Sequence, residues 1–234
     1  MIKKLVFAIV AAVVLVHVLE IKSESQIRKR VVKLSSPHGM CSGEQVRAPS
    51  GVDYILTAAH CRVLEENGQI TITDAEGHTL KRNVIAEDPK SDLLLLEGLP
   101  GLRGLDIAST VSKTEKVRTF THGHNMDTYK TEGEAIQRSK VQVLINMIEN
   151  SEQESACESA PKYKLIKALT PFGEIEACIM EIEEMASTAA IVPGSSGGPL
   201  VDPAGDLVGV ASCSGDGFSY FVTLSDITDF LRGY

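Results

Sequence analysis

Short apolar segments separated by turn-forming residues make up most of this sequence, and that pattern limits the fold more than any other feature. Clusters of Gly, Pro, Ser and Asn interrupt the apolar runs at close spacing. The segments typical of strands are residues 31–34, 54–57, 70–73, 93–96, 141–145, 207–211 and 220–224. Helical signals are few, apart from Ser225 as a capping residue for a short helix over 225–231. The sequence therefore predicts an all-β sandwich or barrel with one short C-terminal helix.

Composition excludes several classes of protein. The chain has 234 residues, 43% hydrophobic and 23% charged, which is typical of one large or two small globular domains. Its 23 basic and 31 acidic residues give a net charge of −8, which argues against a nucleic-acid partner. The five cysteines show no CxxC spacing, and adjacent His60 and Cys61 fit no common zinc pattern. We therefore expect neither a metal ion nor another cofactor.

The N-terminus has the features of an export signal. Lys3 and Lys4 precede an apolar run over residues 5–19. As a helix this run reaches about 22 Å, short of a bilayer core of about 30 Å. Ser23 and Ser25 have the −3 and −1 spacing that a signal peptidase reads, so we expect cleavage after Ser25. An uncleaved membrane anchor through the apolar run is the alternative. Both place the rest of the chain outside the cytoplasm, as a secreted or periplasmic protein in which disulfides can form.

The segment 132–184 is the least clear part of the sequence. Strands, a long loop or a helix near 141–149 are all compatible with it. Its glutamates lack the spacing and the turn glycine of a calcium loop, so we expect them to form a solvated acidic face. These glutamates are Glu149, Glu152, Glu154, Glu158, Glu174, Glu176, Glu181, Glu183 and Glu184.

A histidine and an aspartate stand out from their surroundings. In residues 55–61 an apolar strand leads into small Ala58 and Ala59 and then presents His60 with room around its ring. Asp92 leads directly into another apolar run, and an ionised carboxylate is costly to bury unless it is hydrogen-bonded. A lone histidine is more often structural, and an aspartate before a strand is often a turn cap. A buried acid nevertheless needs a partner, and His60 is the obvious one.

The most specific stretch is the Pro-Gly-Ser-Ser-Gly-Gly-Pro-Leu-Val sequence of residues 193–201. Glycines on both sides of the serine pair allow unusual backbone angles and close approach of a substrate. Successive backbone N–H groups in such a turn can bind an anion, as a tetrahedral oxyanion requires. A flexible linker has a similar composition, but apolar strand-like runs do not normally flank a linker on both sides.

Together these patterns resemble the signature blocks of the trypsin/chymotrypsin family of serine endopeptidases, in the family's order His, Asp, Ser. The matching blocks are residues 57–61, 92–96 and 194–199. The resemblance implies two six-stranded antiparallel β-barrels. One, over 31–115, would carry the histidine and aspartate, and the other, over 116–234, the nucleophile. It also implies an endopeptidase whose partner is a protein or peptide substrate.

Residue roles follow from the same resemblance. Ser196 would be the nucleophile, His60 its general base, and Asp92 the acid that orients the histidine. The backbone N–H groups of Gly194 and Ser196 would form the oxyanion hole. Ser212 matches the family residue that hydrogen-bonds the buried acid.

The resemblance also implies where the substrate binds. Ser212, Cys213 and Ser214 would form a wall along which a substrate strand pairs. Ala190 would lie at the base of the primary specificity pocket. Because an acid is needed there for cleavage after Lys or Arg, we expect a small or apolar side chain to be preferred instead.

The chain departs from trypsin at the zymogen-activation site. Trypsin-like zymogens mature when a new N-terminus pairs with an acid just before the nucleophile, and Ser195 occupies that position here. We therefore expect no such activation. In this respect the chain is closer to bacterial HtrA-type proteases.

Cysteine positions extend the resemblance. Cys41 and Cys61 match the family's disulfide beside the catalytic histidine. Cys157 and Cys178 are a further candidate pair, which would leave Cys213 free near the substrate wall.

Two alternative functions stay open at this point. One is a protease-like peptide-binding module without activity. The other is an esterase or acyl transferase that uses the same three residues.

Overall fold

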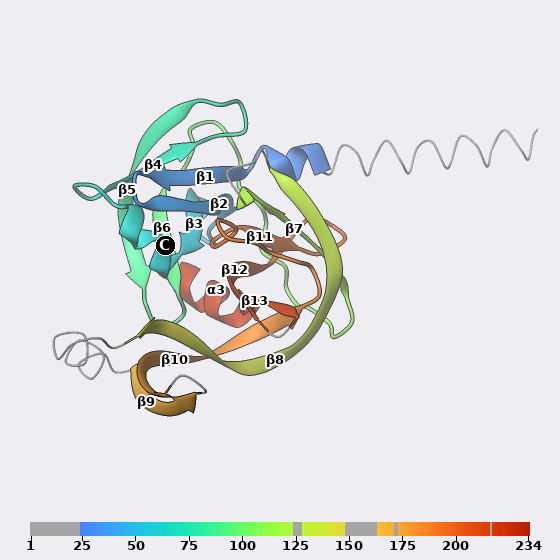
Figure 1. Cartoon of the computed structure of the whole chain (residues 1–234). Helices are drawn as coiled ribbons and strands as arrows, with labels where there is room; N and C mark the ends of the chain where they lie inside the picture. Colours follow the sequence, from blue (N-terminus) through green and yellow to red (C-terminus); the bar gives the residue numbers. More distant parts are fainter. Residues whose placement is uncertain (1–23, 124–127, 148–162, 171–172, 216) are drawn as a thin grey trace, which may run out of the picture.

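The computed structural model describes residues 24–123, 128–147, 163–170, 173–215 and 217–234, which form two adjacent β-barrels (Figure 1). The first barrel is a closed antiparallel ring in the order β1-β2-β3-β6-β5-β4, and pairing of β1 with β4 completes it. Its strands are β1 (Val31–Ser36), β2 (Gly39–Arg47), β3 (Asp53–Ala58), β4 (Gln69–Thr73), β5 (Thr79–Asp88) and β6 (Leu93–Glu97).

Successive side chains of the first barrel point to opposite faces, and both faces are buried where the barrels meet. Leu34 and Ile55 point inward and are fully buried in the barrel's own core. Leu56, the next residue along β3, is also fully buried but belongs to a cluster shared with the second barrel. The continuous apolar run in β3 follows from this double burial.

The second barrel has the ring order β13-β12-β11-β7-β8-β10 and is closed by pairing of β10 with β13. Its strands are β7 (Lys116–Thr121), β8 (Tyr129–Met147), β10 (Gly173–Ser187), β11 (Pro199–Val201), β12 (Leu207–Gly215) and β13 (Phe218–Val222). Outside the ring, β9 (Tyr163–Thr170) pairs with the first half of β10, residues 173–180. Two six-stranded antiparallel barrels are thus confirmed.

The segment 132–184 forms strands wherever it is described. The curved strand β8 follows the outside of the second barrel in Figure 1 and pairs with β7 and then with β10. The helix considered near 141–149 is wrong, because residues 141–147 pair with β10. Val141, Val143 and Ile145 recur at every second position, which is the period of a strand.

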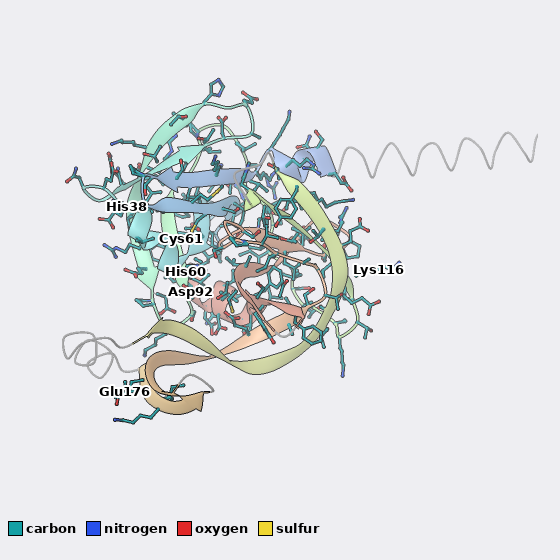
Figure 2. All side chains as sticks on the ribbon, viewed as in Figure 1. His38, His60, Cys61, Asp92, Lys116 and Glu176 are labelled. Carbon is teal, nitrogen blue, oxygen red and sulfur yellow. A yellow bond between two sulfur atoms is a disulfide. The ribbon has the colours of Figure 1, made fainter. Side chains whose placement is uncertain are left out.

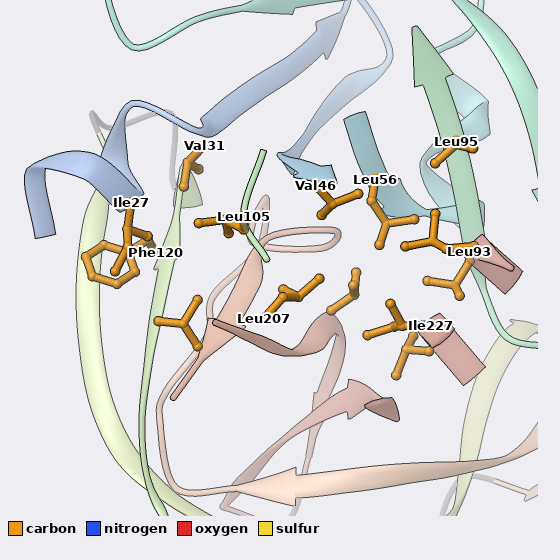
Figure 3. Close-up of a cluster of buried hydrophobic side chains, with 14 residues drawn as sticks. Ile27, Val31, Val46, Leu56, Leu93, Leu95, Leu105, Phe120, Leu207 and Ile227 are labelled. Atoms are coloured by element: carbon orange, nitrogen blue, oxygen red, sulfur yellow. The ribbon is translucent and has the colours of Figure 1, made fainter. Parts of the chain in front are cut away.

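A buried apolar cluster joins the two barrels (Figure 3). Leu56 and Leu93 come from the first barrel, whereas Leu207 comes from the second and Ile227 from the C-terminal helix. Ile27, which precedes β1, adds to the same cluster and is 3% exposed. Each such side chain contributes about 1.5–3 kcal/mol when fully buried, so this cluster holds the barrels together.

The C-terminal helix α3 (Leu224–Leu231) begins one residue earlier than predicted. Thr223, in extended conformation, accepts a hydrogen bond on its Oγ1 from the Asp226 N–H at 3.3 Å. The expected capping role of Ser225 is therefore wrong, because Ser225 already lies inside the first turn. Leu224, expected to end the last strand, is the first residue of the helix for the same reason.

Candidate active site

His60 and Asp92 meet where the first barrel faces the second (Figure 2). His60 follows β3 in the 3-10 turn η1 (Ala59–Leu64), and Asp92 lies immediately before β6. The His60 Nδ1–H donates to Asp92 Oδ2 over 2.8 Å, and the His60 backbone N–H donates to Asp92 Oδ1 over 2.9 Å. Two bonds from one residue fix both the ring orientation and the tautomer. Nε2 is therefore left as the proton-accepting nitrogen of a side chain that is 48% exposed.

Asp92 is buried and has a backbone conformation that few residues adopt. Its φ of +55° lies in the left-handed region, which Asp and Asn tolerate better than other side chains. Its carbonyl accepts the Ala59 N–H at 2.9 Å, and Ser212 Oγ donates to its Oδ2 at 3.2 Å. The bond from Ser212 and the two bonds from His60 compensate the carboxylate for lost hydration, and the Ala59 bond fixes the backbone. The predicted contacts of Asp92 with His60 and Ser212 are both present.

The pKa of His60 is set by opposing effects. Burial acts to lower it, but the hydrogen bond and negative charge of Asp92, with a further contribution from the Glu184 charge, raise the pKa above its ordinary value. A raised pKa makes the imidazole a stronger proton acceptor.

Residues 192–195 form a tight turn just before Ser196. The Ser195 N–H donates to the Val192 carbonyl at 2.9 Å, and Gly194 has a φ of +92°. With Pro193 in the second position and a left-handed glycine in the third, this is a type II turn. Within the described residues, no hydrogen bond uses the amide N–H of Gly194 or of Ser196. The turn thus presents free amides of the kind that an oxyanion hole needs.

Ser42 on β2 holds the carbonyl groups of this serine loop. Its N–H donates to Ser196 O at 2.8 Å, and its Oγ donates to Gly194 O at 2.9 Å. The same Oγ accepts the His122 N–H at 2.8 Å, and Ser42 is fully buried. Ser42, on the first barrel, therefore fixes the carbonyl groups of Gly194 and Ser196, the same two residues whose amide N–H groups are free in the described structure. Sequence analysis missed Ser42, for which the only signal is its position next to Cys41.

Ser196 lies in a loop packed against the end of β3. A Cβ at Gly197 would lie 2.9 Å from the Ala58 nitrogen, so only glycine permits this approach. Because His60 follows Ala58 by two residues, the packing brings the serine loop to the strand that delivers the imidazole. The Ser196 Oγ donates to Ser212 O at 3.2 Å, and in the described part of the chain no hydrogen bond joins it to His60.

The predicted substrate wall lies on β12. Ser212 is buried, Cys213 half-buried and Ser214 exposed. In the described structure β12 pairs with β11 only as far as Val210, so beyond that point this edge has no strand beside it. Ala190 is exposed on the segment after β10, and its place at the base of a specificity pocket stays a prediction.

The disulfide between Cys41 and Cys61 is confirmed, with the two Cα atoms 6.2 Å apart. It ties β2 to the turn that carries His60. Cys213 is a free thiol, and burial raises its pKa to about 12, so it is not a reactive thiolate at neutral pH. The predicted pairing of Cys157 with Cys178 lies outside the residues and side chains that the structure describes.

Glu184 is a buried carboxyl beside this constellation. It is 2% exposed, and the Cys213 thiol donates to its Oε2 at 3.8 Å. Burial raises the pKa of Glu184 to about 7, a contact with the Ser212 hydroxyl opposes the rise, and the Asp92 charge adds to it. The prediction that Glu184 belongs to a solvated acidic face is therefore wrong. Glu184 lies where β10 pairs on both sides, with β8 and β13, inside the barrel wall.

A double barrel that brings a buried aspartate, a histidine and a serine loop together is the architecture of chymotrypsin-like serine proteases. A family model described as a trypsin-like peptidase domain matches residues 39–210. The chain belongs to this trypsin-like peptidase family.

Solved structures of bacterial proteases share the fold. The inactive form of the Rv3671c protease aligns with a TM-score of 0.64 and 18% identity over 90% of this chain and 91% of that chain. The active form of Rv3671c from M. tuberculosis aligns with a TM-score of 0.64 and 18% identity over 88% and 81%. A serine endoprotease from Yersinia pestis aligns with a TM-score of 0.61 and 18% identity over 92% and 66%. At such identity the likeness shows the fold alone. No curated protein matches the chain.

No helix within the described residues has both the length and the apolar character needed to cross a bilayer. Residues 1–23 of the predicted signal or anchor lie outside those residues. Glu24 and Ser25 are described and begin a short helical segment that leads to Ile27 and β1.

Proposed function

We propose that this protein is an exported serine endopeptidase that cleaves peptide bonds through an acyl-enzyme. Membership of the trypsin-like peptidase family supports a protease, and the residue roles are our proposal. The observation that carries them is the pair of His60 hydrogen bonds to buried Asp92, next to a serine loop with two free amides. We place the boundary between its two domains at residues 115 and 116, between β6 and β7.

In the proposed acylation step, Ser196 Oγ bonds to the scissile carbonyl carbon while its proton passes to His60 Nε2. The carbonyl oxygen becomes an oxyanion that accepts the N–H groups of Gly194 and Ser196. The C–N bond then breaks, and the leaving amine takes the proton from His60. Water repeats the sequence on the acyl-enzyme and releases the acid. Asp92 keeps the tautomer correct and stabilises the imidazolium.

The bond from Ser196 to Ser212 O gives the free protein a resting arrangement. A substrate strand lying along residues 212–214 offers a backbone N–H to the Ser212 carbonyl. In this proposal that competition releases the Ser196 hydroxyl to turn toward His60. Substrate binding therefore completes the proton path.

The test is labelling of the purified protein with a fluorophosphonate probe, together with casein degradation. The wild type should be labelled and should degrade casein, and both activities should be lost in Ser196→Ala and in His60→Ala. Equal labelling of the wild type and Ser196→Ala would refute the proposal.

A peptide-binding module without activity is the second candidate, because the Ser196 hydroxyl faces Ser212 O in the free protein. Peptide binding by a wild type that is neither labelled nor active would favour this candidate.

Export is supported by the apolar N-terminus and by the Cys41–Cys61 disulfide. Mass spectrometry of the mature N-terminus tests it. A chain beginning at Gln26 supports signal cleavage, and an intact chain recovered from membranes supports the anchor.

A further inference from the structure

Ser195 occupies the position at which trypsin-like zymogens carry the acid for the N-terminal ion pair. We infer that Ser195 is a positioning residue whose buried hydroxyl, bound to Tyr129 and Thr121, holds the oxyanion turn in its working shape. The inference rests on the proposed function, since the turn needs a working shape only if it serves catalysis.

The Ser195 hydroxyl has all of its hydrogen-bonding capacity in use. Its Oγ accepts the Val192 N–H at 3.1 Å and lies 2.6 Å from Tyr129 Oη and 2.9 Å from Thr121 Oγ1. A hydroxyl has one donor and two acceptor sites, so three partners saturate it. Ser195 is fully buried, and solvent therefore cannot replace a lost partner at low cost.

These bonds fix the orientation of the peptide group between Pro193 and Gly194, which carries the proposed oxyanion donor, the Gly194 N–H. Ser195 binds Val192 twice, through its N–H to the Val192 carbonyl and through its Oγ to the Val192 N–H. Between these anchors lies the peptide that joins Pro193 to Gly194. Type I and type II turns differ mainly by a flip of this central peptide. The flip turns the Gly194 N–H away from the substrate, so holding both ends of the turn keeps the oxyanion donor in place.

The pairing of β7 with β8 explains why the hydroxyls of Thr121 and Tyr129 both reach Ser195 Oγ. Thr121 ends β7 and Tyr129 begins β8, and the two residues are direct cross-strand partners. A Cβ at Gly123 would lie 2.2 Å from Val192 Cγ2 and 2.8 Å from Tyr129 Cε1. Glycine at position 123 therefore lets the tyrosine ring and the turn pack against the same backbone.

Arg28, in the segment before β1, contacts the chain neighbours of both Tyr129 and Thr121. The Arg28 guanidinium donates to Thr128 O and lies over the Phe120 ring, 5.4 Å from its centroid. Thr128 immediately precedes Tyr129, and Phe120 immediately precedes Thr121. The N-terminal segment thus steadies the oxyanion turn through packing and hydrogen bonds.

The experiment compares kcat and KM for a peptide substrate in Ser195→Ala, Tyr129→Phe, Thr121→Val and Thr121→Ser. Removing one oxyanion donor typically costs about 100- to 1,000-fold in kcat, and we expect Ser195→Ala to lose about 100-fold with little change in KM. Tyr129→Phe and Thr121→Val should show smaller losses in kcat. Thr121→Ser keeps the hydroxyl and should therefore keep the kcat of the wild type. Ser187→Ala is the matched control, since Ser187 is a fully buried serine whose hydroxyl binds the backbone of Glu134 and Ala189 and no residue of the turn.

A second readout separates positioning from general stability. A peptide boronate forms a tetrahedral adduct that uses the oxyanion hole, whereas a non-cleavable product peptide does not. Ser195→Ala and Tyr129→Phe should bind the boronate more weakly and the product peptide as well as the wild type does. Unchanged kcat and boronate affinity in both variants, in an active wild type, would overturn the inference alone. A wild type without Ser196-dependent hydrolysis would instead overturn the proposed function.

Discussion

Two glutamates are buried among the side chains that the structure describes, and they differ in what lies beside them. Glu184 lies near the charges of Asp92 and His60 at the candidate active site. Glu44 follows Ser42 by two residues on β2 and is fully buried, and neither of its carboxylate oxygens has a partner among the described residues. Burial raises the pKa of Glu44 well above the ordinary value. The first carboxyl should therefore affect activity, and the second should affect stability alone.

Glu184→Gln should extend activity to lower pH. The negative charge of Glu184 favours protonated His60, so its removal lowers the pKa of His60. The acid limb of kcat/KM reports that pKa. Because the pKa of Glu184 is itself raised to about 7, the carboxyl is only partly ionised there, and the limb should move down by less than about one pH unit. The control is Glu176→Gln, which makes the same change in charge on the β9–β10 hairpin (Figure 2). An acid limb that stays in place in Glu184→Gln would show that the carboxyl does not influence the histidine.

Glu44→Gln should flatten the dependence of stability on pH. Between the ordinary carboxyl pKa and the raised pKa of Glu44 in the folded protein, the folded protein keeps a proton on Glu44 that the unfolded chain has lost. The free energy of unfolding of the wild type should therefore fall as pH rises, by about 1.4 kcal/mol per pH unit for this group. Urea unfolding between pH 5 and 8 measures the slope, with exposed Glu76→Gln as control. Equal slopes in the wild type and Glu44→Gln would contradict the assignment.

At the scale of elements, the sequence predicts those strands whose residues follow a simple apolar pattern. The runs at 93–96 and 207–211 each lie inside an observed strand, β6 and β12. Strand β2 was not predicted, because Gly43, Glu44 and Gln45 interrupt its pattern. These residues are tolerated because other strands of the first barrel and the segment after β6 cover them, for example through the bond from the Gln45 amide to Leu99 O at 3.0 Å. Such long-range compensation does not appear in a local sequence pattern.

The start of α3 offers a test at this scale. Thr223→Ala removes the hydroxyl that accepts the Asp226 N–H and should lower the free energy of unfolding by about 1 kcal/mol. Ser225→Ala, at the position that the sequence favoured as the cap, should cost less. Thermal or urea unfolding of both variants measures the difference. A larger loss in Ser225→Ala would restore the original assignment.

At the scale of the whole molecule, the candidate site exists only because two barrels meet. The family blocks allowed the sequence to predict the pairing of His60 with Asp92, which are 32 residues apart. The bond between Ser195 and Tyr129 joins residues 66 apart, with no motif at the tyrosine. Barrel closure alone brings them together, so sequence analysis could not predict it. The bonds from Ser42 to Ser196 and from Ser212 to Asp92 cross between the barrels, so the reacting groups are only as well ordered as that contact.

That dependence predicts a single cooperative loss of structure and activity. Leu93 and Leu207 are fully buried on opposite sides of the cluster that joins the barrels. Leu93→Ala and Leu207→Ala should each lower the free energy of unfolding by about 3 kcal/mol. Each should shift the urea midpoints of circular dichroism and of hydrolysis together, because neither barrel keeps its packed face without the other. Val63→Ala, at a 66% exposed position, should leave both midpoints unchanged. Separate midpoints for the two signals would mean that one barrel stays folded after the site is lost, and that the shared cluster does not couple them.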